Sequence, residues 1–316
     1  MKKISLVFLL FAFVHLAGYS QSIPVRTLPT EIFRTIDKGI KDTSRWRWKK
    51  GGQLSANLAQ GSLSNWAAGG DNFSMALTTY FNYYLLHRRG KHSWDNNLDF
   101  FFGYVQATSL GNRKTDDRVD FISKYGYTID SSKKWYISGL YNVRTQLFDG
   151  LTYYTRDSGV LSSTFLSPAY ILLSLGMDYK PTSDFSLFLS PLTSRWTMVA
   201  SPRLYKLGVY GVPKGQRLFN ELGAFASINY SKAIMKNVTY KGRLDLFTNY
   251  KNKPQNVDLF FTNYVTFKIN KLLSATYNLD MIYDDDVKLF GKNKNSPALQ
   301  IKSFIGIGFL MNLTKP

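Results

Sequence analysis

"HSWDNNLDFFFGYV", residues 92–105, places large apolar side chains at every second position. One series consists of Trp94, Leu98, Phe100, Phe102 and Tyr104, and the intervening series contains Asp95, Asn97, Asp99 and Gly103. Successive side chains of a β-strand point to opposite faces of the sheet. This period of two therefore predicts a strand with one apolar and one polar face.

The same alternation recurs along most of the chain. Twelve segments show it, beginning near Gln53, Phe73, Ser93, Arg118, Lys134, Ala169, Phe185, Leu218, Val238, Val257, Leu272 and Leu299. Most of them reach the ~9–11 residues that a tilted membrane strand needs, and an even number is typical of single-chain outer-membrane barrels. We therefore predict an all-β fold, a transmembrane antiparallel up-and-down β-barrel of about 12 strands over residues 51–316. A soluble β-sandwich also alternates and is the alternative.

The first twenty residues predict export. Lys2 and Lys3 precede an apolar run over 4–17, and the small residues Gly18 and Ser20 suit a cleavage site, which is typical of a signal peptide. The chain has no cysteine, which excludes a lipoprotein acceptor, disulfides and thiolate chemistry. No later apolar run approaches the ~20 residues of a membrane helix, and the mean hydropathy is −0.20. These features predict an outer-membrane location.

The connections between the segments fall into two classes. Short turns follow the even-numbered segments, whereas the odd-numbered ones lead mostly to longer polar links at Ala107–Asp117, Asp149–Pro168, Leu192–Arg217, Lys251–Asn256 and Asp284–Pro297. Short periplasmic turns and longer extracellular loops are typical of outer-membrane barrels. Beside the short turns the outward series is aromatic, at Tyr83, Trp94, Tyr127, Trp135, Tyr179, Phe185, Tyr230, Tyr240 and Phe267. A membrane interface favours such a girdle, and a sandwich has no reason to form one.

The inward series carries charges of both signs. The acids are Asp95, Asp99, Asp120, Asp178, Glu221, Asp245 and Asp280, and the bases are Arg118, Lys124, Arg144, Lys241, Arg243, Lys268 and Lys302. Equal numbers predict ion pairs across strands rather than the single sign of charge that lines an anion-selective pore. Inward rings accompany them at Tyr80, Tyr84, Phe101, Tyr136, Tyr170, Phe188, Phe219, Phe225, Phe247, Phe260, Tyr264 and Phe304. Together they indicate a narrow or plugged lumen.

The formal net charge of +19 suggests an anionic neighbour. In an exported chain, outer-membrane lipid and lipopolysaccharide are the expected partners, with other outer-membrane or periplasmic proteins as further candidates and nucleic acid excluded. Residues 21–50 are interpreted as a periplasmic lead-in. Its basic aromatic end, Arg45–Lys50, fits either contact with anionic lipid at the inner rim or a solvated tail.

Residues with catalytic or metal-binding chemistry are sparse. Beyond the signal peptide, His87 and His92 are the two histidines, and both lie in the basic turn "HRRGKH". Neither a Ser–His nor an Asp–His catalytic site can be built from a periplasmic turn. The neighbouring arginines and lysine would also repel a metal cation. Asp284, Asp285 and Asp286 have oxygen ligands suited to Ca²⁺ without EF-hand spacing, so solvated carboxylates are the preferred interpretation. We expect no cofactor.

The stretch "SLSNWAAGGDN", residues 62–72, forms the link between the first two segments. Its Gly69 and Gly70 do not follow a buried strand and open a helix, which excludes a dinucleotide fingerprint. Glycine supplies the positive φ of a tight turn. We interpret Asn65, Trp66, Gly69, Gly70 and Asn72 as a turn with an aromatic anchor, and binding by this motif loop is the alternative.

Several stretches also resemble an uncharacterised family, a domain of unknown function in exported Gram-negative proteins thought to form outer-membrane barrels. They are "SLSNWAAGGDN", "KHSWDNNLDFFFGY", "KTDDRVDFISKYGY", "LSPAYILLSLGMDYKP", "FSLFLSPLT", "NKPQNVD" and "IYDDD". The resemblance covers nearly the whole mature chain, and "NWAAGG" is its most specific part. The last loop, "KLFGKNKNSPAL", departs from it by being short. The resemblance implies location and architecture and no activity.

Two functions fit these features. The first is a structural or partner-binding barrel component, whose contact surfaces are the motif loop, the lead-in and a basic outer loop with Arg195, Arg203, Lys206, Lys214 and Arg217. The alternative is a narrow porin-like diffusion channel for small polar solutes. An enzyme ranks third.

Overall fold

The computed structural model describes residues 47–64, 71–155, 158–182, 184–270, 273–283 and 296–313. The signal peptide, most of the lead-in, four of the five motif-loop residues (Asn65, Trp66, Gly69 and Gly70) and the acidic triplet Asp284–Asp286 lie outside these ranges. No helix in the described ranges is long and apolar enough to cross a membrane.

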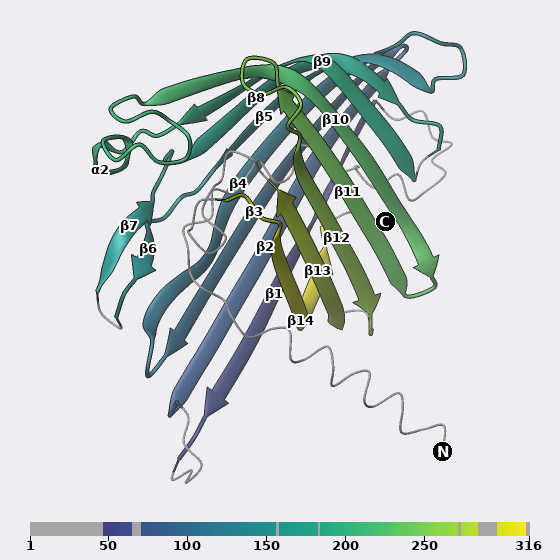
Figure 1. Cartoon of the computed structure of the whole chain (residues 1–316). Helices are drawn as coiled ribbons and strands as arrows, with labels where there is room; N and C mark the ends of the chain where they lie inside the picture. Colours follow the sequence, from purple (N-terminus) through teal and green to yellow (C-terminus); the bar gives the residue numbers. More distant parts are fainter. Residues whose placement is uncertain are drawn as a thin grey trace, which may run out of the picture.

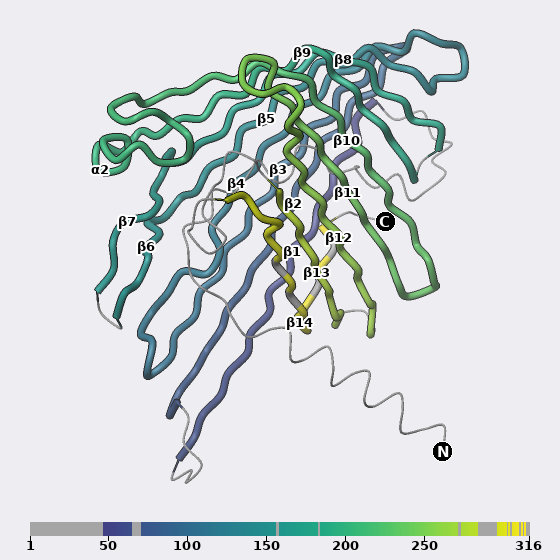
Figure 2. The backbone as a smooth tube through the Cα atoms, viewed as in Figure 1, coloured from purple at the N-terminus to yellow at the C-terminus, as the bar shows by residue number. Residues whose placement is uncertain are grey.

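Twelve strands close into one antiparallel barrel, which confirms the predicted fold class (Figures 1 and 2). They are β1 (Trp48–Ser62), β2 (Phe73–Arg89), β3 (His92–Ala107), β4 (Gly111–Thr128), β5 (Trp135–Thr145), β8 (Ala169–Tyr179), β9 (Phe185–Met198), β10 (Leu218–Met235), β11 (Val238–Asn249), β12 (Asp258–Lys268), β13 (Leu273–Tyr283) and β14 (Gln300–Asn312). Each strand pairs with the strands before and after it in the barrel, so the topology is up-and-down. A separate hairpin, β6 (Gly150–Tyr153) with β7 (Gly159–Ser163), and the short helix α2 (Pro202–Tyr205) lie in two of the longer connections.

Side-chain exposure shows that the apolar series faces outward. Along β8, Leu172 is 1% exposed and Ser174 3%, whereas Leu173 is 48% exposed and Leu175 60%. The exterior of β14 likewise exposes Ile301, Ile305 and Ile307, and many of the buried residues of the barrel are polar or charged. A soluble β-sandwich buries its apolar face, so this arrangement excludes the sandwich alternative.

The predicted long link at Ala107–Asp117 is wrong. Strands β3 and β4 continue to Ala107 and from Gly111, so only a three-residue turn joins them. A bulge at Gly103 and Tyr104 shifts the register once, and the two strands stay paired through the polar residues that were predicted to form the link. The carboxylate of Asp117 accepts hydrogen bonds from the amides of Leu147 and Phe148, so polar residues in this extension are satisfied by the neighbouring loop.

The predicted outer loop at Leu192–Arg217 begins too early. Strand β9 runs through Pro191 to Met198, and its ladders with β8 and β10 both shift register near this proline. Proline within a sheet is accommodated at such bulges, because the irregular position removes the need for its missing N–H. As a consequence Arg195 lies in the strand and points into the barrel, where it is buried, instead of in the basic outer loop.

The barrel closes where its first and last strands meet. The ladder between β1 and β14 runs from the pair Gln53 and Asn312 to the pair Ala56 and Phe309 and is shorter than every other ladder of the barrel. Beyond Ala56, β1 is paired only with β2. This seam joins segments about 250 residues apart in sequence, and it determines whether the sheet is a closed cylinder.

The variant Ala56→Cys/Phe309→Cys tests that closure in a chain that has no cysteine of its own. Directly opposed residues of an antiparallel ladder have Cα atoms about 4.5–5.5 Å apart, within the range of disulfides. We expect a disulfide in the folded protein, detected by mass spectrometry after thiol alkylation without reduction. In the control Ala56→Cys/Ile301→Cys the second cysteine lies ~27 Å further along β14, and both thiols should be alkylated. Two free thiols in the first variant would show that the sheet is open.

Candidate functional site

The barrel lumen contains most of the charged residues predicted to face inward. Asp99, Asp120 and Asp178 are inaccessible to solvent, and Glu221, Asp245, Asp280, Arg144 and Arg243 are buried nearly as completely. Asp95, Arg118, Lys124 and Lys241 are partly buried. Lys268 lies exposed at the end of β12, apart from the others, and the side chain of Lys302 lies outside the described part of the chain.

Asp120 and Asp99 anchor the polar network of β2–β5. Asp120 and Arg144 are directly opposed on β4 and β5, and the guanidinium donates to one carboxylate oxygen at 2.6 and 3.1 Å. Asp99 on β3 accepts hydrogen bonds from the Tyr80 hydroxyl at 2.7 Å and from the amides of Asn82 and Asn97 at 2.9 and 2.6 Å. Each carboxylate therefore has several donors, which offsets the cost of removing it from water.

A second network lies toward the end of the barrel that carries the longer loops. Arg195 on β9 donates two hydrogen bonds to Glu221 on β10, both at 2.8 Å, and a third at 3.4 Å to Asp258 on β12. Its guanidinium also lies 4.1 Å from the centroid of the Phe247 ring. The contact with Asp258 spans four strands of the wall, so this arginine bridges part of the lumen.

The third network crosses the lumen near the short turns. Lys124 on β4 and Lys180, just beyond β8, both bind one oxygen of Asp178, at 2.7 and 2.8 Å. Lys180 also lies 3.9 Å from Asp95 on β3, which is paired with Arg88 of β2. Charges from four strands thus alternate in sign across this end of the barrel.

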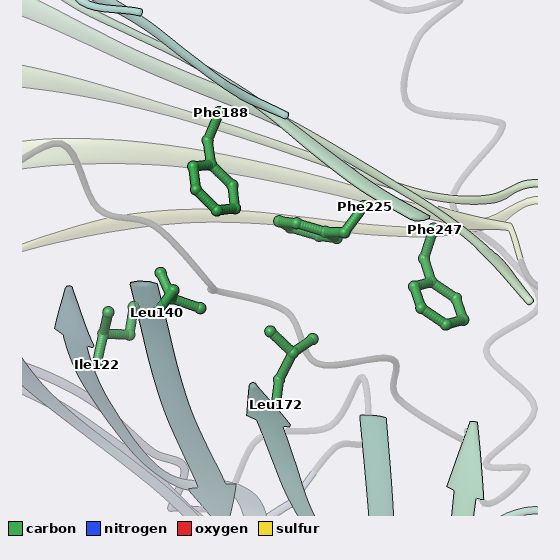
Figure 3. Close-up of a cluster of buried hydrophobic side chains, with 6 residues drawn as sticks. All are labelled: Ile122, Leu140, Leu172, Phe188, Phe225 and Phe247. Carbon is green, nitrogen blue, oxygen red and sulfur yellow. The ribbon is translucent and has the colours of Figure 1, made fainter. Parts of the chain in front are cut away.

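Between the charged groups the two sides of the lumen meet in an apolar cluster (Figure 3). Ile122, Leu140 and Leu172 come from β4, β5 and β8, and Phe188, Phe225 and Phe247 point toward them from β9, β10 and β11. All six are buried, and the rings of Phe188 and Phe225 lie 6.3 Å apart. Apolar side chains from six consecutive strands therefore narrow the lumen at this depth.

Sequence reasoning missed Arg88, Lys180, Arg195 and Asp258 as members of these networks. Three of them share the inward parity of their strands: Arg88 follows Tyr84, Lys180 follows Asp178, and Asp258 precedes Phe260 at even positions. Extending the alternation past each presumed strand end would have found three of them. Arg195 was not predicted to face inward because the bulge at Pro191 shifts the register of the strand.

The motif loop is attached at its C-terminal end. The carboxylate of Asp71 accepts hydrogen bonds from the amide and the hydroxyl of Ser109, both at 2.8 Å, in the turn between β3 and β4. The carbonyl of Asn72 accepts a hydrogen bond from the amide of Leu63. These bonds secure the two ends of the loop to each other and to the next turn. Within the described ranges, no group of three or more His, Asp or Glu side chains is placed to hold a metal ion.

Comparison with known proteins identifies a family and a general likeness. Residues 58–151 match the model of a family described as "Protein of unknown function (DUF3078)", which confirms the resemblance to an uncharacterised family over that range. No curated protein matches the chain.

Similar solved structures are outer-membrane barrels. They include the translocator domain of the autotransporter NalP from Neisseria meningitidis (9% identity, 85% of this chain and 90% of that chain, TM-score 0.40) and the NanC porin (9%, 81% and 98%, 0.38). A third is the COG4313 outer membrane channel from Pseudomonas putida F1 (10%, 83% and 95%, 0.37). Likeness at this level carries no information on activity.

Removing one partner of the ion pair between Asp120 and Arg144 should destabilise the barrel. Arg144→Met leaves the buried Asp120 carboxylate without its guanidinium, which costs about 3–5 kcal/mol of unfolding free energy. The double variant Asp120→Asn/Arg144→Met removes both charges and should recover part of that loss. The measurement is the urea midpoint of the refolded protein, followed by heat-modifiable migration in gels. Lys214→Met, in an exposed loop, is the control and should shift stability by less than ~0.5 kcal/mol. Equal stability of Arg144→Met and the control would refute a structural role of the pair.

Proposed function

We propose that this protein is an integral outer-membrane β-barrel with a side-chain-filled lumen, acting as a structural or partner-binding component of the envelope. The observation that carries the proposal is the apolar cluster of Ile122, Leu140, Leu172, Phe188, Phe225 and Phe247, enclosed in a barrel whose apolar face is outward. The signal-peptide pattern at the N-terminus supports export to that membrane.

Aromatic side chains near the short turns support a membrane location. Trp135 and Tyr179 lie 4.4 Å apart across β5 and β8, and Tyr230 and Tyr240 lie 6.1 Å apart across β10 and β11. With Tyr83, Trp94, Tyr127 and Phe267 exposed on other strands, rings of amphipathic character recur around this end of the exterior. Such rings are favoured at the level of the lipid headgroups.

The lumen chemistry argues against a freely open pore. A hydrophobic constriction loses its water and then blocks ions even where some free cross-section remains. The charges on either side of the cluster are paired with one another, as in Lys124 with Asp178 and Arg195 with Glu221, so neither sign is left in excess to attract a permeating ion. Both features favour a closed lumen.

A narrow diffusion channel is the second candidate. Polar walls lie on both sides of the apolar cluster, and the bridges made by Arg195 and Lys180 depend on long, flexible side chains. Rearrangement of the cluster would then connect the polar parts of the lumen on its two sides. In either function the loop with Arg203, Lys206, Lys214 and Arg217, the motif loop and the lead-in are the proposed contact surfaces. We propose no enzymatic role, since both histidines lie near the short turns.

Planar-bilayer conductance separates the two functions. We expect the inserted wild-type barrel to be silent and Phe188→Ala/Phe225→Ala/Phe247→Ala to give discrete current steps, because truncating three rings opens a path between the walls. The matched control Phe121→Ala/Phe267→Ala/Phe309→Ala removes three exposed outward rings and should remain silent. Protease protection verifies insertion of each protein. Steady wild-type currents would favour the channel, and a silent first variant would show that these rings are not the barrier.

A further inference from the structure

In the described ranges, many of the cations are exposed outside the lumen. Lysine and arginine total 40 in the sequence against 21 acids, and buried charges such as Arg144 and Arg195 form pairs of opposite sign. Exposed lysines and arginines lie on turns, loops and strand ends. At the end of the barrel with the short turns, the β2–β3 turn contributes Arg88, Arg89 and Lys91, together with His87 and His92.

The strand register aligns a row of rings beside that turn. Trp48 on β1 is directly opposite His87 on β2, His87 is opposite Trp94 on β3, and Trp94 is opposite Tyr125 on β4. The rings of Trp48 and His87 lie 4.5 Å apart, and those of Trp48 and Trp94 lie 6.3 Å apart. Since directly opposed residues share one face of a sheet, the row runs continuously across four strands of the exterior.

A second row lies nearer the turn and carries the cations. Arg89 is opposite His92, and His92 is opposite Tyr127. The His92 ring packs edge-on against Tyr127 at 5.2 Å and makes a short hydrogen bond with the hydroxyl of Tyr125. The ammonium of Lys91 lies 5.8 Å from the Tyr127 ring. Arg89, Lys91 and His92 are exposed, so their charges and donors face solvent or lipid.

The carboxylate of Asp95, on the same hairpin, does not neutralise this patch. Asp95 points into the lumen, where it pairs with Arg88 and Lys180. Arg88 is thus directed inward, while Arg89 and Lys91 are directed outward on the same turn. The patch combines exposed cations with a row of amphipathic rings at the level where headgroups and acyl chains meet.

We propose that Trp48, His87, Arg89, Lys91, Trp94 and Tyr127 form a binding site for the phosphodiester headgroup of an anionic glycerophospholipid. The site rests on the proposed membrane location, which puts the short turns at the periplasmic face and hence beside the inner leaflet. The cations bind the phosphate, and the indole and phenol rings pack on the glycerol backbone and the first acyl carbons. Lipopolysaccharide phosphates have the same chemistry but belong to the opposite leaflet, at the end with the longer loops.

Native mass spectrometry of the full-length mature barrel, released from nanodiscs, tests the site. The nanodiscs contain phosphatidylcholine alone or an equimolar mixture with phosphatidylglycerol, and a third set contains lipid A. We expect phosphatidylglycerol to remain bound to the wild type. Retention by Arg89→Gln/Lys91→Gln should fall roughly 30-fold, since each of the two basic residues near an anionic surface contributes about 1 kcal/mol.

Lys232→Gln/Lys236→Gln is the matched control, because it removes two exposed lysines near the β10–β11 turn at the same end of the barrel. It should retain the lipid as the wild type does. If both variants lost phosphatidylglycerol equally, its retention would be due to general charge attraction, and the proposed site would be wrong. Preferential retention of lipid A, lost in Arg89→Gln/Lys91→Gln, would overturn the choice of glycerophospholipid. A chain that fails to insert into any nanodisc would refute the membrane location itself, whereas an inserted barrel without selectivity refutes only the site.

Discussion

Closure of the sheet is the constraint on which the rest of this structure depends. In hydrocarbon an unpaired backbone N–H or C=O costs several kcal/mol, so a β-sheet can span a membrane only when its first and last strands pair. Here that pairing joins Gln53–Ala56 to Phe309–Asn312. The short seam gives the first and last strands their second neighbour, and by closing the sheet it separates an apolar exterior from an enclosed interior.

The enclosed interior serves as the core of the protein, with chemistry unlike that of a soluble core. Carboxylates such as Asp99 and Asp120 are fully buried there and are stabilised by donors from adjacent strands. Apolar rings such as Phe188 and Phe225 form a buried cluster beside them. Removal of a charge from water is tolerated because its partner is held opposite it by the strand register.

The distribution of charge follows from this division between inside and outside. Ion pairs such as Lys124 with Asp178 balance buried charge inside the barrel, whereas exposed cations such as Arg89 and Lys91 lie on turns of the described ranges. Adjacent residues of one turn can serve both purposes, because alternation sends Arg88 inward and Arg89 outward. The same residue type therefore forms an ion pair inside the barrel at one position and is exposed on the outside at the next.

The alternation of side chains in the sequence by itself determined the twelve strands, their order and, where no bulge intervenes, the face on which a residue lies. That information is local, since each strand presents one parity on the exterior of the barrel and the other to the lumen. Only the tertiary structure decided which inward groups meet, as with Lys180 and Asp95 or Arg195 and Asp258, because those contacts depend on register and on the curvature of the wall. The bulge at Pro191 and the short turn at Thr108–Leu110 could not be predicted from the local pattern either. In both places the residues by themselves resemble a loop, and pairing with neighbouring strands keeps them in the ladder.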